Sequence, residues 1–330
     1  MLEKILKSYL EHICGTDAVQ ENLPLSKRTT FKIGGPARFF VTVRTKQTLV
    51  KLISALNYIE YPYRIIGAGS NLLVSDRGFN GVIIKNAFRE IVQNGNFIYA
   101  DAGASLAALA KFARDRNLRG LEFAATIPGT IGGAIYMNAG AHGSSISDIV
   151  AMVDVLETSG EMISPAIISL DARACKFAYR KSLFMRRRDL IITGAYFFLS
   201  PGNPAQIAAL ENQYRDHRRQ TQPREPSAGS VFRNPNISNQ RSPFNKGGVA
   251  QRAAAVFDDE VVPAAKLIDQ LGLKGTRIGD AAISEKHANF IVNMGTATAS
   301  DVKKLIRLVK KRVRDAHRIV LKAEIEFLGD

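Results

Sequence analysis

Two segments of this chain carry so little side-chain volume that any fold must bring their main chain close to something else. The first is IIGAGSNLLVS at residues 65–75, where Gly67 and Gly69 follow a strand-like run. The second spans residues 120–143 and holds six glycines in 24 residues, with mostly small side chains between them. Because glycine loses more conformational freedom on folding than other residues, ordering such a length of it is costly. We therefore expect a flat or extended ligand, or another stretch of backbone, to lie against these segments.

The first segment permits phosphate binding without proving it. Gly67 and Gly69 fit the first two positions of the pattern Gly-x-Gly-x-x-Gly, but Leu72 occupies the third and no helical pattern follows, so a Rossmann site is weakly supported. Backbone N–H groups of such a turn can still converge on one anion, and Ser70 and Asn71 add side-chain donors. The alternative is a tight turn between two strands.

The second segment favours a ring cofactor that carries a pyrophosphate. Small residues suit the face of a ring, and N–H groups suit phosphates. Thr126, Thr130 and Asn138 supply polar atoms among the small residues. Close packing of two backbones is the alternative that the residues leave open.

Bulk composition describes an ordinary folded protein with one unusual property. The 330 residues predict about two domains and include 46% hydrophobic and 23% charged residues. Lysine and arginine exceed aspartate and glutamate by 45 − 30 = 15, which favours phosphate-bearing partners or simply a solvated basic face. Cys14 and Cys175 are far apart and the five histidines lack ligand spacing, so we expect a reducing compartment and no metal. With no signal-like or membrane-spanning run, the sequence predicts a cytoplasmic location.

Short strands and helices alternate along the chain, which is α+β character. Apolar spacing predicts helices at the N-terminus, around 49–56 and after Ser105, and Gly120 lies beyond the end of the last of these. Asn203 and Pro204 predict the start of a helix with a basic end, and further helices are expected over 263–272 and from Ser300. The expected strands are 37–43, 63–66, 81–85, 97–102, 149–157, 190–199 and 319–328. The stretch 236–262 is interpreted as an insertion or mobile loop.

Five motifs in a fixed order resemble one enzyme family. After the glycine segments come FAYRKSLF (177–184), PSAGSVFRNP (226–235), KGTRIGDAAISEKHANFIVN (274–293) and AEIEFLG (323–329). Together, from about residue 22 to residue 329, they resemble the UDP-N-acetylenolpyruvoylglucosamine reductases of peptidoglycan precursor synthesis. The resemblance implies an α+β fold with an FAD-binding domain of the PCMH or vanillyl-alcohol-oxidase type. It also implies non-covalent FAD, with NADPH as the reductant and a UDP-sugar enolpyruvate as the substrate.

The resemblance also implies domain limits and site residues. We expect a lead-in at 1–27, an FAD-binding domain at 28–199 with lobes 28–86 and 87–199, and a substrate-binding domain at 200–330. The implied cofactor-binding residues are Gly67, Ala68, Gly69, Ser70, Asn71, Leu72, Thr126, Pro128, Gly129, Gly132, Gly133, Asn138 and Ala141. The implied catalytic residues are Arg180, Ser230 and Glu324, and the implied substrate-binding residues are Tyr179, Arg180, Gln222, Ser230 and Asn234.

Reduction of an enolpyruvyl ether explains these residue types. Hydride delivered to C3 of the substrate leaves negative charge at C2, which spreads into the carboxylate. An arginine can hold that carboxylate, a protonated glutamate can donate a hydrogen bond to it, and a well-placed serine can protonate a very basic carbon. Considered alone, Arg180 could be one more solvated cation, Ser230 a turn residue, and Glu324 an exposed acid on the same strand face as Glu326.

Two departures from the family pattern stand out. Only 230 − 180 = 50 positions separate Arg180 from Ser230, which resembles the short form that lacks a substrate-capping tyrosine loop. Gln222 and Arg224 are then the candidates for holding the substrate diphosphate. The 236–262 stretch, by contrast, is longer than in that short form.

Two rival functions remain at this stage. One is a PCMH-type flavoprotein that acts on another substrate. The other is a basic nucleic-acid-binding protein, although the chain has no aromatic-rich RNA-binding motif and no tryptophan, so we expect no nucleic-acid partner. The oligomeric state cannot be predicted from the sequence.

Overall fold

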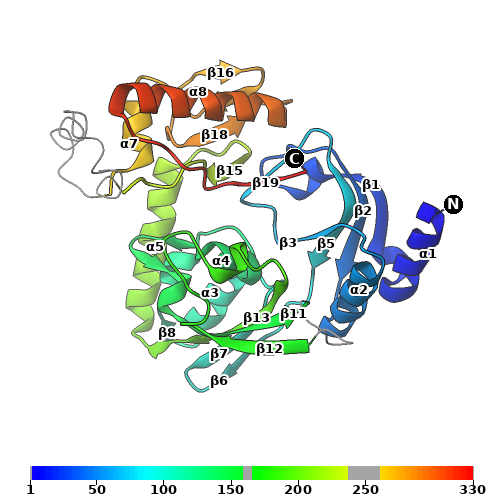
Figure 1. Cartoon of the computed structure of the whole chain (residues 1–330). Coiled ribbons are helices and arrows are strands. Elements are labelled where there is room, and N and C mark those ends of the chain that lie inside the picture. Colours follow the sequence, from blue (N-terminus) through cyan, green and yellow to red (C-terminus); the bar gives the residue numbers. More distant parts are fainter. Residues whose placement is uncertain (1, 159–165, 237–260, 330) are drawn as a thin grey trace, which may run out of the picture. The chain divides into compact units, whose positions relative to one another are not determined.

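The computed structural model describes residues 2–158, 166–236 and 261–329 (Figure 1). The chain divides into two compact units. Unit 1 comprises residues 1–23, 37–68 and 79–220, and unit 2 comprises residues 24–36, 69–78 and 221–330. Two short segments, 24–36 and 69–78, therefore belong to the unit built mainly from the C-terminal third of the chain. The crossing after residue 68 falls inside the first glycine-rich segment.

The first half of unit 1 is a small sheet covered by helices. Its strand order is β1-β2-β5-β3, and β2–β5 and β3–β5 are parallel. The apolar side chains of β2 and β5 are buried with those of α2, and the Thr45 hydroxyl accepts the Thr48 N–H to cap α2. The elements are α1 (Leu2–Cys14), β1 (Val19–Pro24), β2 (Pro36–Val43), α2 (Lys46–Tyr58), β3 (Tyr63–Ile66) and β5 (Phe79–Asn86).

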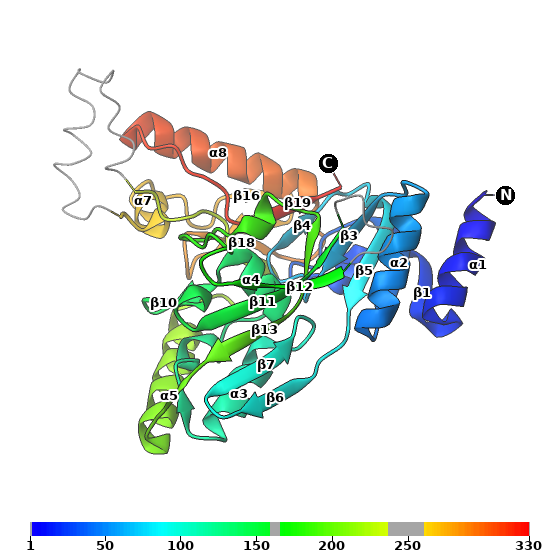
Figure 2. The same ribbon diagram turned by 60° about the horizontal axis from the view of Figure 1, so that its bottom comes forward.

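The second half of unit 1 is an antiparallel sheet with two helices on its core face. The strand order is β12-β11-β13-β7-β6, and Figure 2 shows β6, β7 and β13 side by side. Buried side chains of α3 and α4 share one core with this sheet. The elements are β6 (Ile91–Asn94), β7 (Phe97–Asp101), α3 (Leu106–Arg114), β8 (Leu118–Arg119), α4 (Ile131–Met137), β9 (Gly140–Ala141), β10 (Ser144–Ser145), β11 (Val150–Glu157), β12 (Ala166–Asp171), β13 (Leu190–Phe198) and β14 (Ser200–Pro201).

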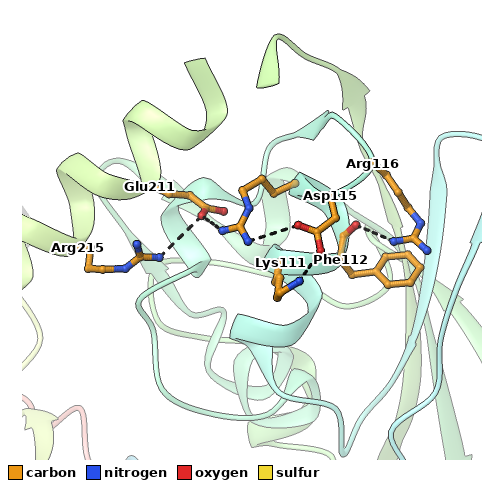
Figure 3. Close-up of polar contacts among 7 residues, drawn as sticks. Lys111, Phe112, Asp115, Arg116, Glu211 and Arg215 are labelled. Carbon is orange, nitrogen blue, oxygen red and sulfur yellow. Dashed lines mark hydrogen bonds and ion pairs between the residues drawn. The ribbon is translucent and has the colours of Figure 1, made fainter. Parts of the chain in front are cut away.

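The long helix α5 (Pro204–Thr221) is attached to unit 1 mainly by polar contacts. Only two of its side chains are buried, Ile207 and Glu211. The Glu211 carboxylate is 2% exposed and lies 2.6 Å from the Arg114 guanidinium at the end of α3, with Arg215 at 4.0 Å (Figure 3). The hydrogen bond to Glu211 raises the pKa of Arg114. A buried carboxylate needs such a partner, so this ion pair is one of the contacts that attach α5 to unit 1.

Further along α5, two residues contact the second glycine-rich segment. Arg218 donates to the Thr126 carbonyl oxygen, and burial lowers the pKa of Arg218. The ring of Tyr214 stacks on His142 with a centroid distance of 3.8 Å. Helix α5 therefore supports both ends of that segment.

Unit 2 is a four-stranded antiparallel sheet packed against α8. The strand order is β15-β18-β17-β16, and α8 runs along this sheet (Figure 1). The apolar face of α8 is buried in the core, and its lysines and arginines lie on the other side. The elements are β4 (Leu72–Val74), β15 (Ser227–Ser230), α7 (Ala264–Asp269), β16 (Arg277–Ile278), β17 (Ala281–Ile283), β18 (Phe290–Asn293), α8 (Ala299–His317) and β19 (Glu326–Leu328).

Most predicted elements are confirmed, and four are wrong in their limits. Helix α7 covers only Ala264–Asp269 of the predicted 263–272 and ends before Gly272. Asn203 Oδ1 accepts the N–H groups of Ala205 and Gln206, as expected for a helix start. Helix α3 ends at Arg114, well before Gly120. Helix α8 is capped by Thr298 and Asp301 rather than opened by Ser300. The predicted strand 319–328 is a strand only at Glu326–Leu328, because only these residues pair with β4.

Two further expectations concern the cysteines and the 236–262 stretch. Cys14 and Cys175 are free thiols, and burial raises the pKa of each to about 11. Of the 236–262 stretch, residues 237–260 lie outside the described residues. Within the described ranges, no helix has both the length and the apolar character needed to span a bilayer.

Candidate active site

The two glycine-rich segments meet inside unit 1 at Gly67 and Thr130. A Cβ on Gly67 would lie 2.3 Å from the Thr130 hydroxyl, so only glycine allows this approach. The Lys85 ammonium group donates to the Gly67 carbonyl oxygen. The predicted cofactor residues Gly67 and Thr126–Gly133 therefore contribute to one region of unit 1.

Several small residues in this region are explained by the protein's own packing. A Cβ on Gly132 would lie 3.0 Å from the Ala102 Cβ, and the Gly132 N–H donates to the Ala102 carbonyl at 2.9 Å. The N–H groups of Ile131 and Gly133 are bonded to the Ala104 carbonyl and to the Thr130 hydroxyl. The start of α4 therefore uses its amides internally and does not offer them to a phosphate. Backbone packing, the alternative left open by the sequence, accounts for part of the glycine content.

Other small residues of the same region face outward. Ala68, Pro128 and Gly133 are exposed, and a Cβ on Gly133 would meet only the Thr130 hydroxyl at 3.6 Å. An exposed surface with so few projecting side chains fits the face of a flat cofactor such as FAD. The feature that suits FAD is therefore the surface of small residues, because the amides at the start of α4 are already hydrogen-bonded within the protein.

Asn138 and Arg180 tie the second glycine-rich segment to the Tyr-Arg motif. Asn138 ends α4 in a left-handed conformation and is 3% exposed. Its Nδ2 donates to the Ala178 carbonyl at 3.0 Å and to Ser147 Oγ at 3.2 Å. Arg180, with φ +53°, donates to the carbonyl oxygens of Asn138 and Gly140 at 3.4 and 2.5 Å.

Two further predicted site residues of unit 1, Tyr179 and Ala141, lie next to these contacts of Arg180. The guanidinium of Arg180 lies 5.1 Å from the ring centroid of Tyr179, which is half exposed. Ala141 pairs with Ser144 in a two-stranded hairpin next to this contact. The left-handed backbone and the two carbonyl contacts hold Arg180 against the glycine-rich segment, so it is not simply one of the exposed basic residues that follow it.

In unit 2, the segments that carry Ser230, Glu324 and Asn71 are joined by hydrogen bonds. The Glu324 N–H donates to the Val231 carbonyl at 2.8 Å, directly after Ser230. Asn71 Nδ2 donates to the Glu324 carbonyl at 3.1 Å, and the Asn71 carbonyl accepts the Glu326 N–H at 2.9 Å. The chain continues from Asn71 into β4, whose first residue is Leu72 and which pairs in parallel with β19.

Ser230 lies at an irregularity of β15. The register against β18 shifts between Ser227 and Ser230, and the intervening Gly229 has φ +78°. A bulge of this kind re-aims the side chain that follows it, and a left-handed conformation favours glycine. The Ser-Ala-Gly-Ser motif therefore has a local structural reason for its glycine.

Four other predicted site residues belong to unit 2: Asn234, Gln222, Gly69 and Ser70. Asn234 Oδ1 accepts the Ala264 N–H at 3.0 Å, at the start of α7. Gln222 is half-buried in the loop after α5. Gly69 has φ +67° and accepts the Thr30 N–H on its carbonyl, while Ser70 is half-buried.

One cavity in unit 2 brings together residues that the sequence did not connect. Its volume is about 420 Å³. Its polar lining includes Arg224, Glu225, Arg277, Ser284, Glu285 and Lys286. Of these only Arg224 was selected from the sequence as a site residue. Arg277, Ser284, Glu285 and Lys286 all belong to the motif 274–293, which carried the family resemblance but in which no residue was given a role.

Comparison with protein families covers both units. Residues 37–164 match the model of an FAD-binding domain, and residues 222–328 match the C-terminal domain of UDP-N-acetylenolpyruvoylglucosamine reductase. These matches confirm the predicted α+β fold class, with an FAD-binding domain of the PCMH type followed by a substrate domain.

Whole-length relatives agree with these models. The chain is 40% identical to the UDP-N-acetylenolpyruvoylglucosamine reductase of Anoxybacillus flavithermus, with 99% of each chain covered. The identity to the reductase of Caldanaerobacter subterraneus is 37% with complete coverage of both. The crystal structure of this reductase from Thermus caldophilus is similar with a TM-score of 0.73 and 32% identity, over 93% of this chain and 98% of that one. The chain therefore belongs to the UDP-N-acetylenolpyruvoylglucosamine reductase family, the FAD-containing, NADPH-dependent reductases of peptidoglycan precursor synthesis.

Proposed function

We propose that this chain reduces UDP-N-acetylglucosamine enolpyruvate to UDP-N-acetylmuramate in the cytoplasm, with Arg180, Ser230 and Glu324 as its catalytic residues. The observation that supports this assignment most directly is the hydrogen bond from the Glu324 N–H to the Val231 carbonyl, since it holds the two motifs of unit 2 together. Arg180 belongs to unit 1, and its place in the same reaction rests on the family motif.

The cofactor is assigned to the small-residue surface of unit 1 and to the turn that leaves it. Gly67, Ala68, Pro128 and Gly133 provide exposed or half-buried backbone there. When bound, FAD supplies the hydride that it has received from NADPH. The remaining steps are assigned to side chains of this chain.

Each catalytic side chain has one task in the proposal. Arg180 holds the substrate carboxylate with its planar fork, and Glu324, in its protonated form, donates a hydrogen bond to the charge that develops there. After C3 has received the hydride, the O–H bond of Ser230 breaks and its proton forms the C–H bond at C2. Solvent then restores the proton to the Ser230 oxygen. Positioning matters more than acidity here, because the accepting carbon is far more basic than the serine oxygen.

The substrate diphosphate is assigned to Arg224, Gln222 and Asn234, and Tyr179 is assigned to substrate binding on the family motif alone. Arg224 lines the cavity of unit 2, where Arg277 and Lys286 add positive charge and Glu225 and Glu285 offset part of it.

We also propose that residues 28–199 hold the cofactor and that residues 200–330 hold the substrate.

The purified protein tests this function directly. We expect the visible absorption of bound flavin, bleaching on anaerobic addition of NADPH, and recovery when the enolpyruvyl UDP-sugar is added. Bleaching without recovery would instead indicate a flavoprotein that acts on another substrate. Loss of the colour on denaturation and filtration checks that the flavin is not covalently attached.

A substitution at Gly133 separates cofactor binding from folding. Gly133→Val places its Cβ near only one atom, the Thr130 hydroxyl at 3.6 Å, so stability should change by less than about 0.5 kcal/mol. The added branches project from the surface assigned to FAD, so the dissociation constant of FAD should rise about tenfold or more. Flavin titration of the FAD-free protein, monitored by fluorescence, measures this change.

Gly132→Val is the matched comparison. Its Cβ would press on Ala102 at 3.0 Å, so this variant should lose stability as well as affinity. An unchanged FAD affinity in a folded Gly133→Val protein would remove this face from the cofactor site.

A further inference from the structure

Asn289 holds the two residues that follow Ser230 through three hydrogen bonds. It is 4% exposed and lies in the turn immediately before β18. Its carbonyl accepts the Val231 N–H at 2.8 Å, its Oδ1 accepts the Phe232 N–H at 3.0 Å, and its Nδ2 donates to the Phe232 carbonyl at 2.8 Å. The Asn289 amide therefore pairs with Phe232 as a backbone peptide of a neighbouring strand would.

This side chain continues a strand pairing that ends at Ser230. The β15–β18 pairing has its register shift between Ser227 and Ser230, and its last pair is Ser230 with Phe290. Beyond that pair the side chain of Asn289 supplies the donor and the acceptor that a further strand residue would offer. An amide is needed for this, since an ionised carboxylate accepts but cannot donate and an aliphatic side chain does neither.

The same two residues also contact the segment that carries Glu324. The Val231 carbonyl accepts the Glu324 N–H at 2.8 Å, and Phe232 forms an isolated bridge with Ala323. Val231 is thus bonded to Asn289 through its N–H and to Glu324 through its carbonyl. A shift of the Val231–Phe232 backbone would move both catalytic residues of unit 2.

We propose that Asn289 is a positioning residue for proton transfer, which fixes the backbone next to Ser230 and thereby the place of the Ser230 hydroxyl relative to Glu324. The inference rests on the proposed role of Ser230 as proton donor. Asn289 itself is oriented by its N–H, which donates to Nδ1 of His287 at 3.2 Å, and by the His287 ring, which packs edge-on against Phe290.

Asn289→Asp tests the donor function with almost no change in size. When the new carboxyl is ionised, toward the upper end of the pH range in which the enzyme is stable, it cannot donate to the Phe232 carbonyl. Flavin reoxidation by the enolpyruvyl UDP-sugar should then slow about 10²-fold, the effect expected of a misplaced reacting group. Flavin reduction by NADPH should stay within about twofold, because Ser230 takes no part in it.

The pH profile provides a readout that loss of folding would not mimic. Burial raises the pKa of a carboxyl group, and the carboxyl introduced by Asn289→Asp could, once protonated, again donate to the Phe232 carbonyl. The ratio of variant to parent reoxidation rates should therefore rise as the pH falls. His287, whose Nδ1 accepts the Asn289 N–H, and Glu324, whose backbone N–H donates to the Val231 carbonyl, are titratable residues bonded to this cluster. Dividing by the parent rate removes the part of the pH dependence that the two proteins share.

Asn293→Asp is the control, since it makes the same change at the other end of β18 and at similar burial. The Asn293 side chain donates to the Phe31 carbonyl at 3.2 Å and accepts the N–H groups of Gly295 and Ala297, so its bonds lie away from Ser230 and Glu324. With FAD in excess, its two half-reactions should keep the parent ratio.

Two results would overturn the inference. They are equal slowing of both half-reactions in Asn289→Asp, and a ratio of variant to parent rates that does not change with pH. If Ser230→Ala also leaves reoxidation unchanged, the proposed catalytic assignment fails instead.

Discussion

Ser230→Ala is expected to slow flavin reoxidation by the enolpyruvyl UDP-sugar by roughly 10³-fold or more, while flavin reduction by NADPH is nearly unchanged. Loss of a positioned proton donor costs about 10² to 10⁴-fold, and Ser230 is the serine that follows the Gly229 bulge on this segment. Stopped-flow measurement of the flavin absorbance, with each substrate mixed separately, gives the two rates. Equal loss in both half-reactions would count against Ser230 as the acid.

Ser227→Ala is the control for this prediction. Ser227 lies at the other end of the same short strand, and its backbone carbonyl accepts the Thr30 hydroxyl at 2.7 Å. That hydrogen bond does not involve the Ser227 hydroxyl, so the substitution should leave it in place. The Ser227 hydroxyl accepts the Gly229 N–H at 3.5 Å, a long and weak hydrogen bond whose loss should change the bulge little. Both half-reactions should remain within about threefold of the parent, as for a substitution that leaves the reacting groups in place. A comparable loss in both serine variants would point to damage to β15 rather than to missing acid.

The local parts of the fold could be predicted from the sequence because their causes are local. The run PARFFVTV has alternating and β-branched residues and forms β2, and the Ser105 hydroxyl accepts the Ala108 N–H as a helix cap should. The error over 319–328 has a non-local cause. Alternation persists through this stretch, but its pairing partner β4 is only three residues long, so only Glu326–Leu328 becomes a strand.

The residues of the candidate site also divide into those with local causes and those with non-local causes. Family motifs selected Ser230 and Glu324. Asn289 also lies in a quoted motif, residues 274–293, but that motif does not indicate its role, which depends on contacts with Phe232 across 57 positions of sequence. The glycines illustrate the reverse case. Their number suggested a ligand surface, yet Gly67 and Gly132 are required by the protein's own packing and Gly133 is not. The structure is needed to distinguish a glycine required by packing from one that suits a ligand, because both requirements select the smallest residue.

Arg114→Met is expected to destabilise unit 1 by about 3 kcal/mol, because it leaves the carboxylate of Glu211 buried without its main partner. Glu211 is 2% exposed, and Arg215, at 4.0 Å, is too distant to replace the 2.6 Å contact fully (Figure 3). Urea denaturation of the FAD-free protein measures the loss. Lys111→Met removes the exposed ion pair to Asp115 on the same helix and should leave the stability nearly unchanged, because solvent screens such a pair.

The double variant with Glu211→Met decides whether the cause is charge burial. If the cost of Arg114→Met comes from an unpaired buried carboxylate, replacing that carboxylate as well should restore most of the lost stability, since an apolar pair of similar volume can substitute for a buried ion pair. Glu211→Met alone should cost less than Arg114→Met, because the Arg114 side chain is 30% exposed and can remain hydrated. A double variant as unstable as Arg114→Met would mean that α5 is held by the packing of the arginine stem. In either case the loss should weaken FAD binding, since α5 supports the second glycine-rich segment through Arg218 and Tyr214.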